Sequence, residues 1–202
     1  MACVEFSEVV RRRRMVRTFE QRPVPRDVLE RILDIARRGP SAGFSQGFEF
    51  VVLDEPGQVK AFWTETAHPE FHDPDQRDDV LPPVIVLPLS NKRAYLDRYS
   101  EEDKAQFGLQ TEETWPVPFW TVDTGMAVML MLLAAVDLGL GGWYFGIPHG
   151  QEELMKRLGV PEGYEPIGAV ALGYAHPDDR PSGSSQTRRR RGLDELVHWN
   201  GW

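Results

Sequence analysis

The chain has 202 residues, 41% of them hydrophobic, which is enough to build one domain with a full core. Its formal net charge of −8 argues against a general nucleic-acid-binding protein. The single cysteine, Cys3, excludes an intramolecular disulfide framework and a multi-cysteine zinc site, and we assign it no role.

The N-terminal residues do not show the charged segment followed by an apolar one that is typical of a secretory signal. Four arginines at positions 11–14 precede polar sequence, so they do not read as a twin-arginine export signal. We therefore expect a cytoplasmic protein.

The first predicted elements are two helices. A short helix covers about Phe6 to Arg14, with Ser7 as a possible cap. A stronger pattern runs from Arg26 to Arg38, where apolar residues share one face and opposite charges four residues apart share the other. Gly39 and Pro40 should end this second helix. The apolar face is Val28, Leu29, Ile32, Leu33 and Ala36, and the charge pairs are Arg26/Glu30, Asp27/Arg31 and Asp34/Arg38.

The stretch from Arg38 to Leu53 joins that helix to a predicted buried strand, Phe48–Leu53. Small or ring-constrained residues fill its middle, and they would let a ligand approach the backbone amides. Taken alone, the same pattern of glycine, proline and serine is also typical of an ordinary helix-to-strand loop.

The next stretch should contain a helix at Gln58–Thr66, a polar loop at His68–Pro82 and a buried strand at Val84–Leu89 that one proline interrupts. The acids of this loop lack the glycine and the terminal glutamate that a calcium loop places at fixed positions. Its prolines also argue against the helix that His68 and His72 would need to bind a metal together. We expect no metal site.

The segment Ser90–Trp120 is long, charged and aromatic, and it includes W-P-V-P-F-W. Its prolines argue against a regular central strand. Trp115, Phe119 and Trp120 could form a lid over a planar ligand. Alternatively, they could form a satellite cluster packed beneath a long loop.

The most apolar segment, Met126–Val136, predicts a helix that is too short to span a bilayer. Because it is apolar on every side, it should be buried on every side, as a central core helix or one shared with a second subunit. A glycine-rich, strand-like stretch, a helix at Gln151–Leu158 and a last strand at Ile167–Tyr174 follow. This order of strands and helices favours a single mixed α+β domain over residues 1–202.

Several motifs that carry chemistry are missing, among them the G-x-S-x-G elbow, the P-loop, H-E-x-x-H and a G-x-G-x-x-G turn. What stands out is two arginine clusters at opposite ends of an acidic chain, Arg11–Arg14 with Arg17, and Arg188–Arg191. Each alone is typical of a solvated face. Brought together, they would need an anion between them, and a phosphate suits the forked donors of arginine.

Five segments in this order resemble the FMN-dependent nitroreductase family, with an actinobacterial-like character. They are R-R-M-V-R-T-F, P-V-P-R-D-V-L-E-R-I-L, R-R-G-P-S-A-G-F-S-Q-G-F-E-F, L-G-L-G-G and R-R-R-R-G-L-D-E-L-V-H. The resemblance implies an α+β sandwich with a mixed, mostly antiparallel central sheet flanked by helices. It also implies an intertwined homodimer in which the tail, 181–202, wraps the partner subunit.

The resemblance further implies an FMN at each of two interface sites. Hydride would pass from NAD(P)H through FMN to a nitro compound, a quinone or a similar small electrophile, by a ping-pong mechanism. No side chain is expected to act as catalytic acid or base, because the flavin carries the chemistry. No nucleic acid or membrane partner is expected.

The family's FMN-binding positions fall on specific residues here. Arginines of the first motif would hold the FMN phosphate and the ribityl or flavin oxygens, the small-residue loop would offer backbone contacts, and a glycine pair would face the flavin ring near N5. A late basic pair completes the set, although four consecutive arginines leave its register uncertain by one or two residues. The predicted cofactor-binding residues are Arg13, Arg14, Arg17, Pro40, Ser41, Ala42, Gly43, Gln46, Gly141, Gly142, Arg188 and Arg190, and the predicted substrate-binding residues are Phe44, Trp115, Phe119 and Trp120.

Three positions depart from the family pattern. Met15 replaces a serine, Phe44 replaces an asparagine that binds the flavin, and Gly47-Phe48 replaces Pro-Trp. Phe44 cannot hydrogen-bond flavin N3 or O2, which leaves room for a deazaflavin in place of FMN. A second alternative is a protein that binds flavin without turnover. An RNA-binding module would need aromatic motifs among the basic residues, and the sequence has none.

Overall fold

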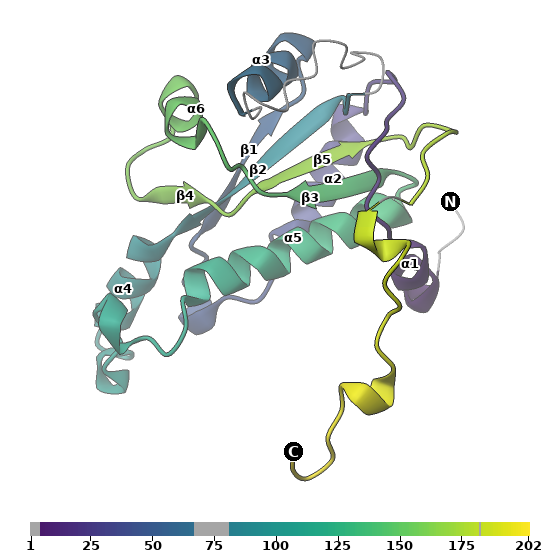
Figure 1. Ribbon diagram of the computed structural model, residues 1–202. Helices are drawn as coiled ribbons and strands as arrows, with labels where there is room; N and C mark the ends of the chain where they lie inside the picture. The colour runs from purple at the N-terminus through teal and green to yellow at the C-terminus, as the bar shows by residue number, and fades with distance from the viewer. Residues whose placement is uncertain (1–4, 67–80, 182) are drawn as a thin grey trace.

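The computed structural model describes residues 5–66, 81–181 and 183–202 (Figure 1). The predicted loop at His68–Pro82 and Cys3 lie largely or wholly outside these residues. The helices are α1 (Phe6–Arg12), α2 (Arg26–Ala36), α3 (Pro56–Thr66), α4 (Lys92–Ser100), α5 (Phe119–Asp137) and α6 (Gln151–Arg157), and the strands are β1 (Phe48–Leu53), β2 (Val84–Asn91), β3 (Gly141–Phe145), β4 (Tyr164–Pro166) and β5 (Ala169–Gly173). Short 3₁₀ turns include η1 (Ala42–Phe44), η3 (Ala105–Phe107), η4 (Glu112–Thr114), η5 (Gly183–Ser185) and η6 (Leu193–Glu195).

The sheet is antiparallel throughout, in the order β1-β2-β5-β3, and the short β4 pairs with β2. The predicted strand Val84–Leu89 lies within β2, which continues through Pro88, the residue that interrupts its apolar run. Although Pro88 has no N–H to donate, its carbonyl accepts a hydrogen bond from Ile167 N at 3.1 Å. The proline therefore remains part of a central strand.

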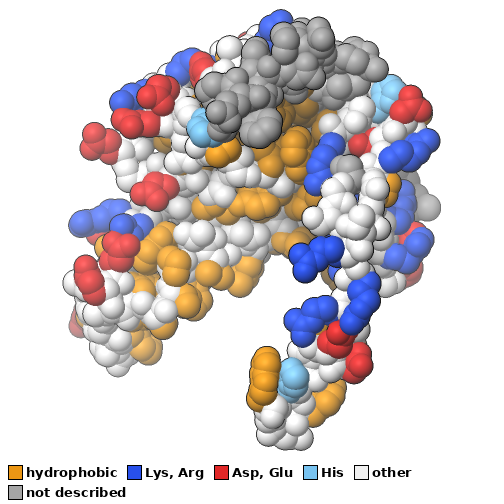
Figure 2. All heavy atoms as spheres, in the orientation of Figure 1, with side chains coloured by type: hydrophobic (Ala, Val, Ile, Leu, Met, Phe, Trp, Pro, Cys, Tyr) orange, Lys and Arg blue, Asp and Glu red, His pale blue; other side chains and the backbone are white. Residues whose placement is uncertain are grey.

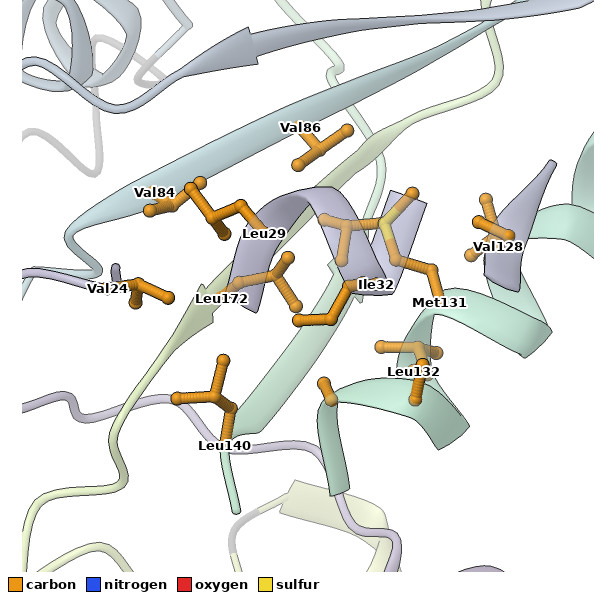
Figure 3. Packing of buried hydrophobic residues seen from close by; sticks show 14 residues of the cluster. Val24, Leu29, Ile32, Val84, Val86, Val128, Met131, Leu132, Leu140 and Leu172 are labelled. Atoms are coloured by element: carbon orange, nitrogen blue, oxygen red, sulfur yellow. The ribbon is translucent and has the colours of Figure 1, made fainter. Parts of the chain in front are cut away.

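Helices cover both faces of the sheet (Figure 1). Alternate residues of β2 face opposite ways, so that Val84 and Val86 pack with α2 and α5, while Ile85 and Leu87 pack with α3 and α6. Figure 3 shows the first of these clusters, in which Leu29 and Ile32 of α2 meet Met131 and Leu132 of α5. Burial on both faces explains why β2 reads as a continuous apolar run. The α+β prediction is confirmed.

The helix α2 confirms its sequence pattern. Its predicted apolar face is turned to the core, with Leu29 and Ile32 fully buried. Asp34 forms ion pairs with Arg37 and Arg38, and the second of these is a predicted pair. Arg26 instead pairs with Asp54 at 2.8 Å, because β1 ends beside the start of α2.

Two predicted elements are shorter than expected, and one helix was not predicted. The helix α1 ends at Arg12 rather than Arg14, and no side chain caps it, so Ser7 is not its cap. The helix α4 was missed inside the segment Ser90–Trp120, although Asn91 caps it by accepting from Ala94 N at 3.3 Å. The predicted last strand, Ile167–Tyr174, is β5 alone, since Gly168 adopts a positive φ of 142° and breaks the chain direction after β4.

The helix α5 begins seven residues earlier than predicted and has 19 residues. By length and composition alone α5 could cross a membrane, as could many core helices of globular proteins, and 44% of its most apolar 18 residues are buried. The single chain does not bury α5 on every side. Val122, Met126 and Met129 form an exposed apolar stripe with helical spacing, and hydrophobic side chains gather along this region in Figure 2.

Candidate functional site

The loop from Pro40 to Gly47 adopts an unusual backbone. Gly43, Phe44 and Gln46 all have positive φ, of 61°, 56° and 51°. A left-handed conformation costs a non-glycine residue about 1–2 kcal/mol, so other contacts must hold the loop in place. Phe44 is 75% exposed at its tip and is therefore no core residue.

Hydrogen bonds inside the loop and from α4 hold part of this conformation. The Gln46 amide donates to Ser41 Oγ at 2.7 Å, and the Ser45 hydroxyl donates to the Ala42 carbonyl at 2.6 Å. Arg98 of α4 donates from Nε to the Gly43 carbonyl at 3.0 Å. These hydrogen bonds hold the backbone around Phe44, whose side chain points outward. One of them comes from α4, a helix that the sequence pattern did not predict.

A buried carboxylate at the N-terminal end of α5 completes the anchoring of this loop. Asp123 is 3% exposed, and its Oδ2 accepts from Ala42 N and from the Tyr95 hydroxyl, each at 2.8 Å. Burial, together with the hydrogen bond to Asp123, raises the pKa of Tyr95, whose phenol therefore stays protonated and donates. Sequence reasoning missed Asp123, although a lone acid at the start of a strongly apolar helix was a usable signal.

The arginine motif lies at the other end of α5 (Figure 1). Arg12 and Arg14 line a hollow of about 170 Å³ together with Val136, Gly139, Leu140, Gly141, Val16 and Ala175. The predicted positions were Arg13, Arg14 and Arg17. Of these three, only Arg14 lines the hollow. The point at which α1 ends, Arg12, determines which of the following side chains face it.

A second buried carboxylate fixes the arginine motif. Asp179 forms an ion pair with Arg14, and its Oδ1 accepts from the amides of Arg17 at 2.9 Å and Thr18 at 2.8 Å. Burial acts to raise the pKa of Asp179, but Arg14 and the two amides outweigh it and leave that pKa below the usual value. The guanidinium of Arg17 lies over the Trp143 ring, 5.5 Å from its centroid.

The glycine pair Gly141 and Gly142 opens β3 beside this motif. A Cβ on Gly141 would lie 2.5 Å from Val16, and one on Gly142 would lie 2.8 Å from Leu132. Val16 N also donates to the Gly142 carbonyl at 3.1 Å. Gly141 therefore lets the arginine segment pack directly on the sheet edge, and Gly142 lets α5 do so. That the amides of these glycines face a flavin stays a prediction.

The late arginines lie on the C-terminal segment, which leaves the body past α1 (Figure 1) and carries a cluster of Arg side chains (Figure 2). Arg189 pairs with Glu195 at 2.5 Å, and Arg191 donates to the Glu195 carbonyl. Arg188 and Arg190, the predicted pair, are exposed. Their contact with a phosphate stays a prediction.

The two halves of the predicted cofactor site are far apart in one chain. Asp123 binds the Pro40–Gly47 loop, whereas Val136 lines the arginine hollow. Their separation of 13 positions on α5 corresponds to about 20 Å along the helix axis. A single chain therefore does not bring the loop and the arginines to one point.

The predicted substrate residues Trp115 and Trp120 are buried with Tyr95 in an aromatic cluster. The Trp115 indole donates to the Leu109 carbonyl at 2.9 Å, and its ring lies 4.7 Å from Tyr99. Phe119 packs at the edge of the cluster and is half-buried. The structure thus shows the satellite cluster; contact of these residues with a substrate stays a prediction.

Within the described ranges, no group of three or more His, Cys, Asp or Glu side chains is arranged to hold a metal ion. The chemistry at both ends of α5 is instead that of arginine guanidinium groups, backbone amides and aromatic rings.

Comparisons with known proteins agree with this architecture. A model of the nitroreductase family matches residues 10–174. An NADH dehydrogenase of Thermus thermophilus is 28% identical over 209 residues, covering 93% of this chain and 92% of that protein. A protein of Methanothermobacter thermautotrophicus, provisionally named NADH dehydrogenase/NAD(P)H nitroreductase, is 25% identical over 181 residues, covering 88% and 80%.

A solved structure of a nitroreductase family protein from Streptococcus pneumoniae superposes with a TM-score of 0.74 at 19% identity, covering 96% of this chain and 99% of that one. This likeness shows the fold, and the sequence relatives support an oxidoreductase role. Because the family model spans most of the chain, from α1 to the end of β5, the chain belongs to the nitroreductase family.

Proposed function

We propose that the protein transfers hydride from NAD(P)H through bound FMN to a small electrophile such as a nitro compound or a quinone. The observation that carries this proposal is the hollow lined by Arg12, Arg14 and the Gly139–Gly141 turn. Guanidinium groups beside a glycine-rich turn are suited to a phosphate. Family membership supplies the redox class.

The residues present fit FMN at both halves of the proposed site. Arg12 and Arg14 would hold the phosphate, with Arg188 and Arg190 closing over it. The Pro40–Gly47 loop would face the ring system with Phe44 and with the backbone beside it. Bound FMN would supply the acceptor and donor of hydride; the chain's own residues bind it, orient it and exclude water.

We propose that the site is assembled from two chains. The loop and the arginine hollow lie about 20 Å apart along α5, so one chain cannot offer both to one cofactor. The exposed stripe of Val122, Met126 and Met129 gives a second copy an apolar surface to cover. The tail, 181–202, with exposed Trp199 and Trp202, would wrap that partner.

In this arrangement the described protein groups supply position rather than proton transfer. Tyr95 keeps its proton because burial raises its pKa, and its hydroxyl is already used by Asp123. Reductant and electrophile would approach the same exposed side of the loop in turn, which is the order of a ping-pong reaction.

The absorbance spectrum of the purified protein tests the cofactor. We expect flavin bands that bleach when NADH or NADPH is added without oxygen and return when a nitro compound or quinone follows. Flavin bands that never bleach would support a protein that binds flavin without turnover. A deazaflavin spectrum would replace FMN by that cofactor, and the lack of any bound or titratable flavin would overturn the proposal.

Sedimentation tests the assembly. We expect a dimer at micromolar concentration, and Met126→Asp should shift it toward monomer and weaken FMN binding, because a charge would be buried in the interface. Met126→Leu is the matched control and should remain dimeric. A wild-type chain that sediments as a stable monomer and binds FMN would contradict a site shared between two chains.

A further inference from the structure

We propose that Asp123 is a positioning residue that holds the Pro40–Gly47 loop in its cofactor-binding shape. This inference rests on the proposed function. Asp123 reaches the loop from α5, through the bond from Ala42 N to its Oδ2, and reaches α4 through the Tyr95 hydroxyl on the same oxygen. One carboxylate oxygen therefore joins three separate pieces of the chain.

The loop needs such an anchor because its own residues provide little packing. It is built from small residues, and its large side chain, Phe44, points to solvent. Left-handed residues in sequence persist only where surrounding structure holds them, and they are common at ligand-binding sites. The bond from the Ala42 amide to Asp123 lies at the first residue of the η1 turn, directly before the left-handed run.

Tyr95 sets the distance between the loop and α4. Its ring is fully buried, and a Cβ on Gly47 would lie 2.5 Å from it. Likewise, a Cβ on Gly43 would lie 2.7 Å from the ring of Tyr99. Gly47 therefore packs on the ring of Tyr95 and Gly43 on the ring of Tyr99. Asp123 holds the Tyr95 ring by accepting a hydrogen bond from the Tyr95 hydroxyl.

This geometry predicts which substitutions preserve the anchor. Both hydrogen bonds end on one oxygen, so the amide oxygen of Asp123→Asn can accept them. Asp123→Leu has a similar shape but no acceptor, and it leaves the Ala42 amide and the Tyr95 hydroxyl without this partner. Tyr95→Phe removes the donor to Asp123 and the contact of the hydroxyl with Ser41, and it keeps the ring that supports Gly47.

Thr124 provides the matched control on the next residue of α5. It is fully buried, and its hydroxyl donates to the Trp120 carbonyl of its own helix at 2.6 Å. Thr124→Val therefore disturbs a buried polar group of the same helix without removing a bond to the loop.

The experiment measures three quantities in the full-length protein: hydrogen exchange of the amides at 42–46, affinity for FMN, and the melting temperature without flavin. In Asp123→Leu, the exchange rate of the amides at 42–46 should rise at least tenfold and the affinity for FMN should fall at least tenfold. In Tyr95→Phe, the exchange rate and the affinity should each change by about threefold. In Asp123→Asn, each should change by less than threefold. Thr124→Val should change only the melting temperature.

A folded Asp123→Leu variant with wild-type exchange and wild-type FMN affinity would overturn the inference. If Asp123→Leu does not fold, Tyr95→Phe decides at the Ala42 amide, whose acceptor is Asp123: faster exchange of that amide supports the anchor, and unchanged exchange overturns it. A wild-type protein without affinity for FMN would contradict the proposed function alone, since the exchange measurements still report whether Asp123 holds the loop.

Discussion

The two ends of α5 present their binding groups in different ways. At the N-terminal end, Asp123 ties a left-handed loop to α4 through hydrogen bonds that lie within one chain. At the C-terminal end, Asp179 fixes only the backbone after α1 and the side chain of Arg14, while Arg188 and Arg190 lie on a segment that leaves the body.

This difference teaches that one half of the proposed site is preorganised before a ligand arrives and the other is not. A preorganised loop loses little conformational entropy on binding, whereas exposed arginines on a tail must be ordered by the ligand or by a partner chain. We therefore expect substitutions at the loop to act through geometry and substitutions at the arginines to act through charge.

The largest effect is expected from Asp179→Ala, because Asp179 is the buried carboxylate that binds Arg14 and the backbone of the arginine segment. It removes an ion pair and leaves two amides without their acceptor. We expect a loss of about 3 kcal/mol in the free energy of unfolding, measured by urea denaturation. Asp178→Ala, one residue away and exposed, is the control and should change it by less than about 0.5 kcal/mol. Equal losses in the two variants would contradict the anchor.

The arginine hollow itself predicts a smaller but selective effect. Arg12→Ala and Arg190→Ala should each weaken FMN binding at least tenfold, equivalent to about 1.4 kcal/mol, because each removes a charge-assisted bond to phosphate. Riboflavin, which lacks the phosphate, should bind as before. Arg11→Ala, which removes an exposed arginine paired with Glu8, is the control.

The register of the arginines can be read from the same titrations. The sequence predicted Arg13 and the structure places Arg12 in the hollow, so the two variants should be compared directly. A larger loss with Arg13→Ala would support the sequence register. Parallel losses of FMN and riboflavin would mean that these arginines do not bind the phosphate.

A pH titration separates the charge of Asp179 from its hydrogen bonds. Its pKa in the folded state lies below the usual value of 3.8, so the ionised form stabilises the fold above about pH 4, and this contribution is lost as the pH falls through the lowered pKa. Asp179→Asn should destabilise less than Asp179→Ala. Its difference from wild type should shrink as the solution is acidified below about pH 4; a constant difference would show that the charge has no role.

A helix could be predicted from the sequence where one of its faces packs on the core and the other faces solvent. The helix α2 lies between core and solvent, so its apolar stripe was readable from the sequence, although the helix ends at Ala36, two residues before the predicted Arg38. The helix α4 was not predicted, because its buried side is mainly Tyr95 beside the charges of Lys92, Arg93, Asp97 and Arg98. The helix α4 supports the Pro40–Gly47 loop through Tyr95 and Arg98, and its sequence therefore has no apolar stripe that would predict a helix.

The candidate site shows the same limit. The loop and the arginine motif were found because their residue types are unusual, but both carboxylates that hold them were missed. Asp123 is separated from Ala42 by 81 residues and Asp179 from Arg17 by 162, so only the fold brings each pair together. The sequence alone could not say which arginines line the hollow, because that depends on the residue at which α1 ends.

The smallest effect is expected at Phe44, and it tests whether the loop is held against its own preference. Phe44→Asn should stabilise the protein by about 1 kcal/mol, because asparagine tolerates the left-handed backbone that phenylalanine adopts there at a cost. Phe107→Asn, at an exposed phenylalanine without a positive φ, is the control and should not stabilise the protein.

The affinity of the Phe44 variants for FMN shows whether an asparagine there also binds the flavin. If the Asn amide also binds the flavin, Phe44→Asn should tighten FMN by about 0.5–1.5 kcal/mol, whereas Phe44→Gly, which relieves the same strain without an amide, should not. A fall in both stability and affinity for Phe44→Asn would mean that the phenyl ring itself makes a contact that the loop exists to present.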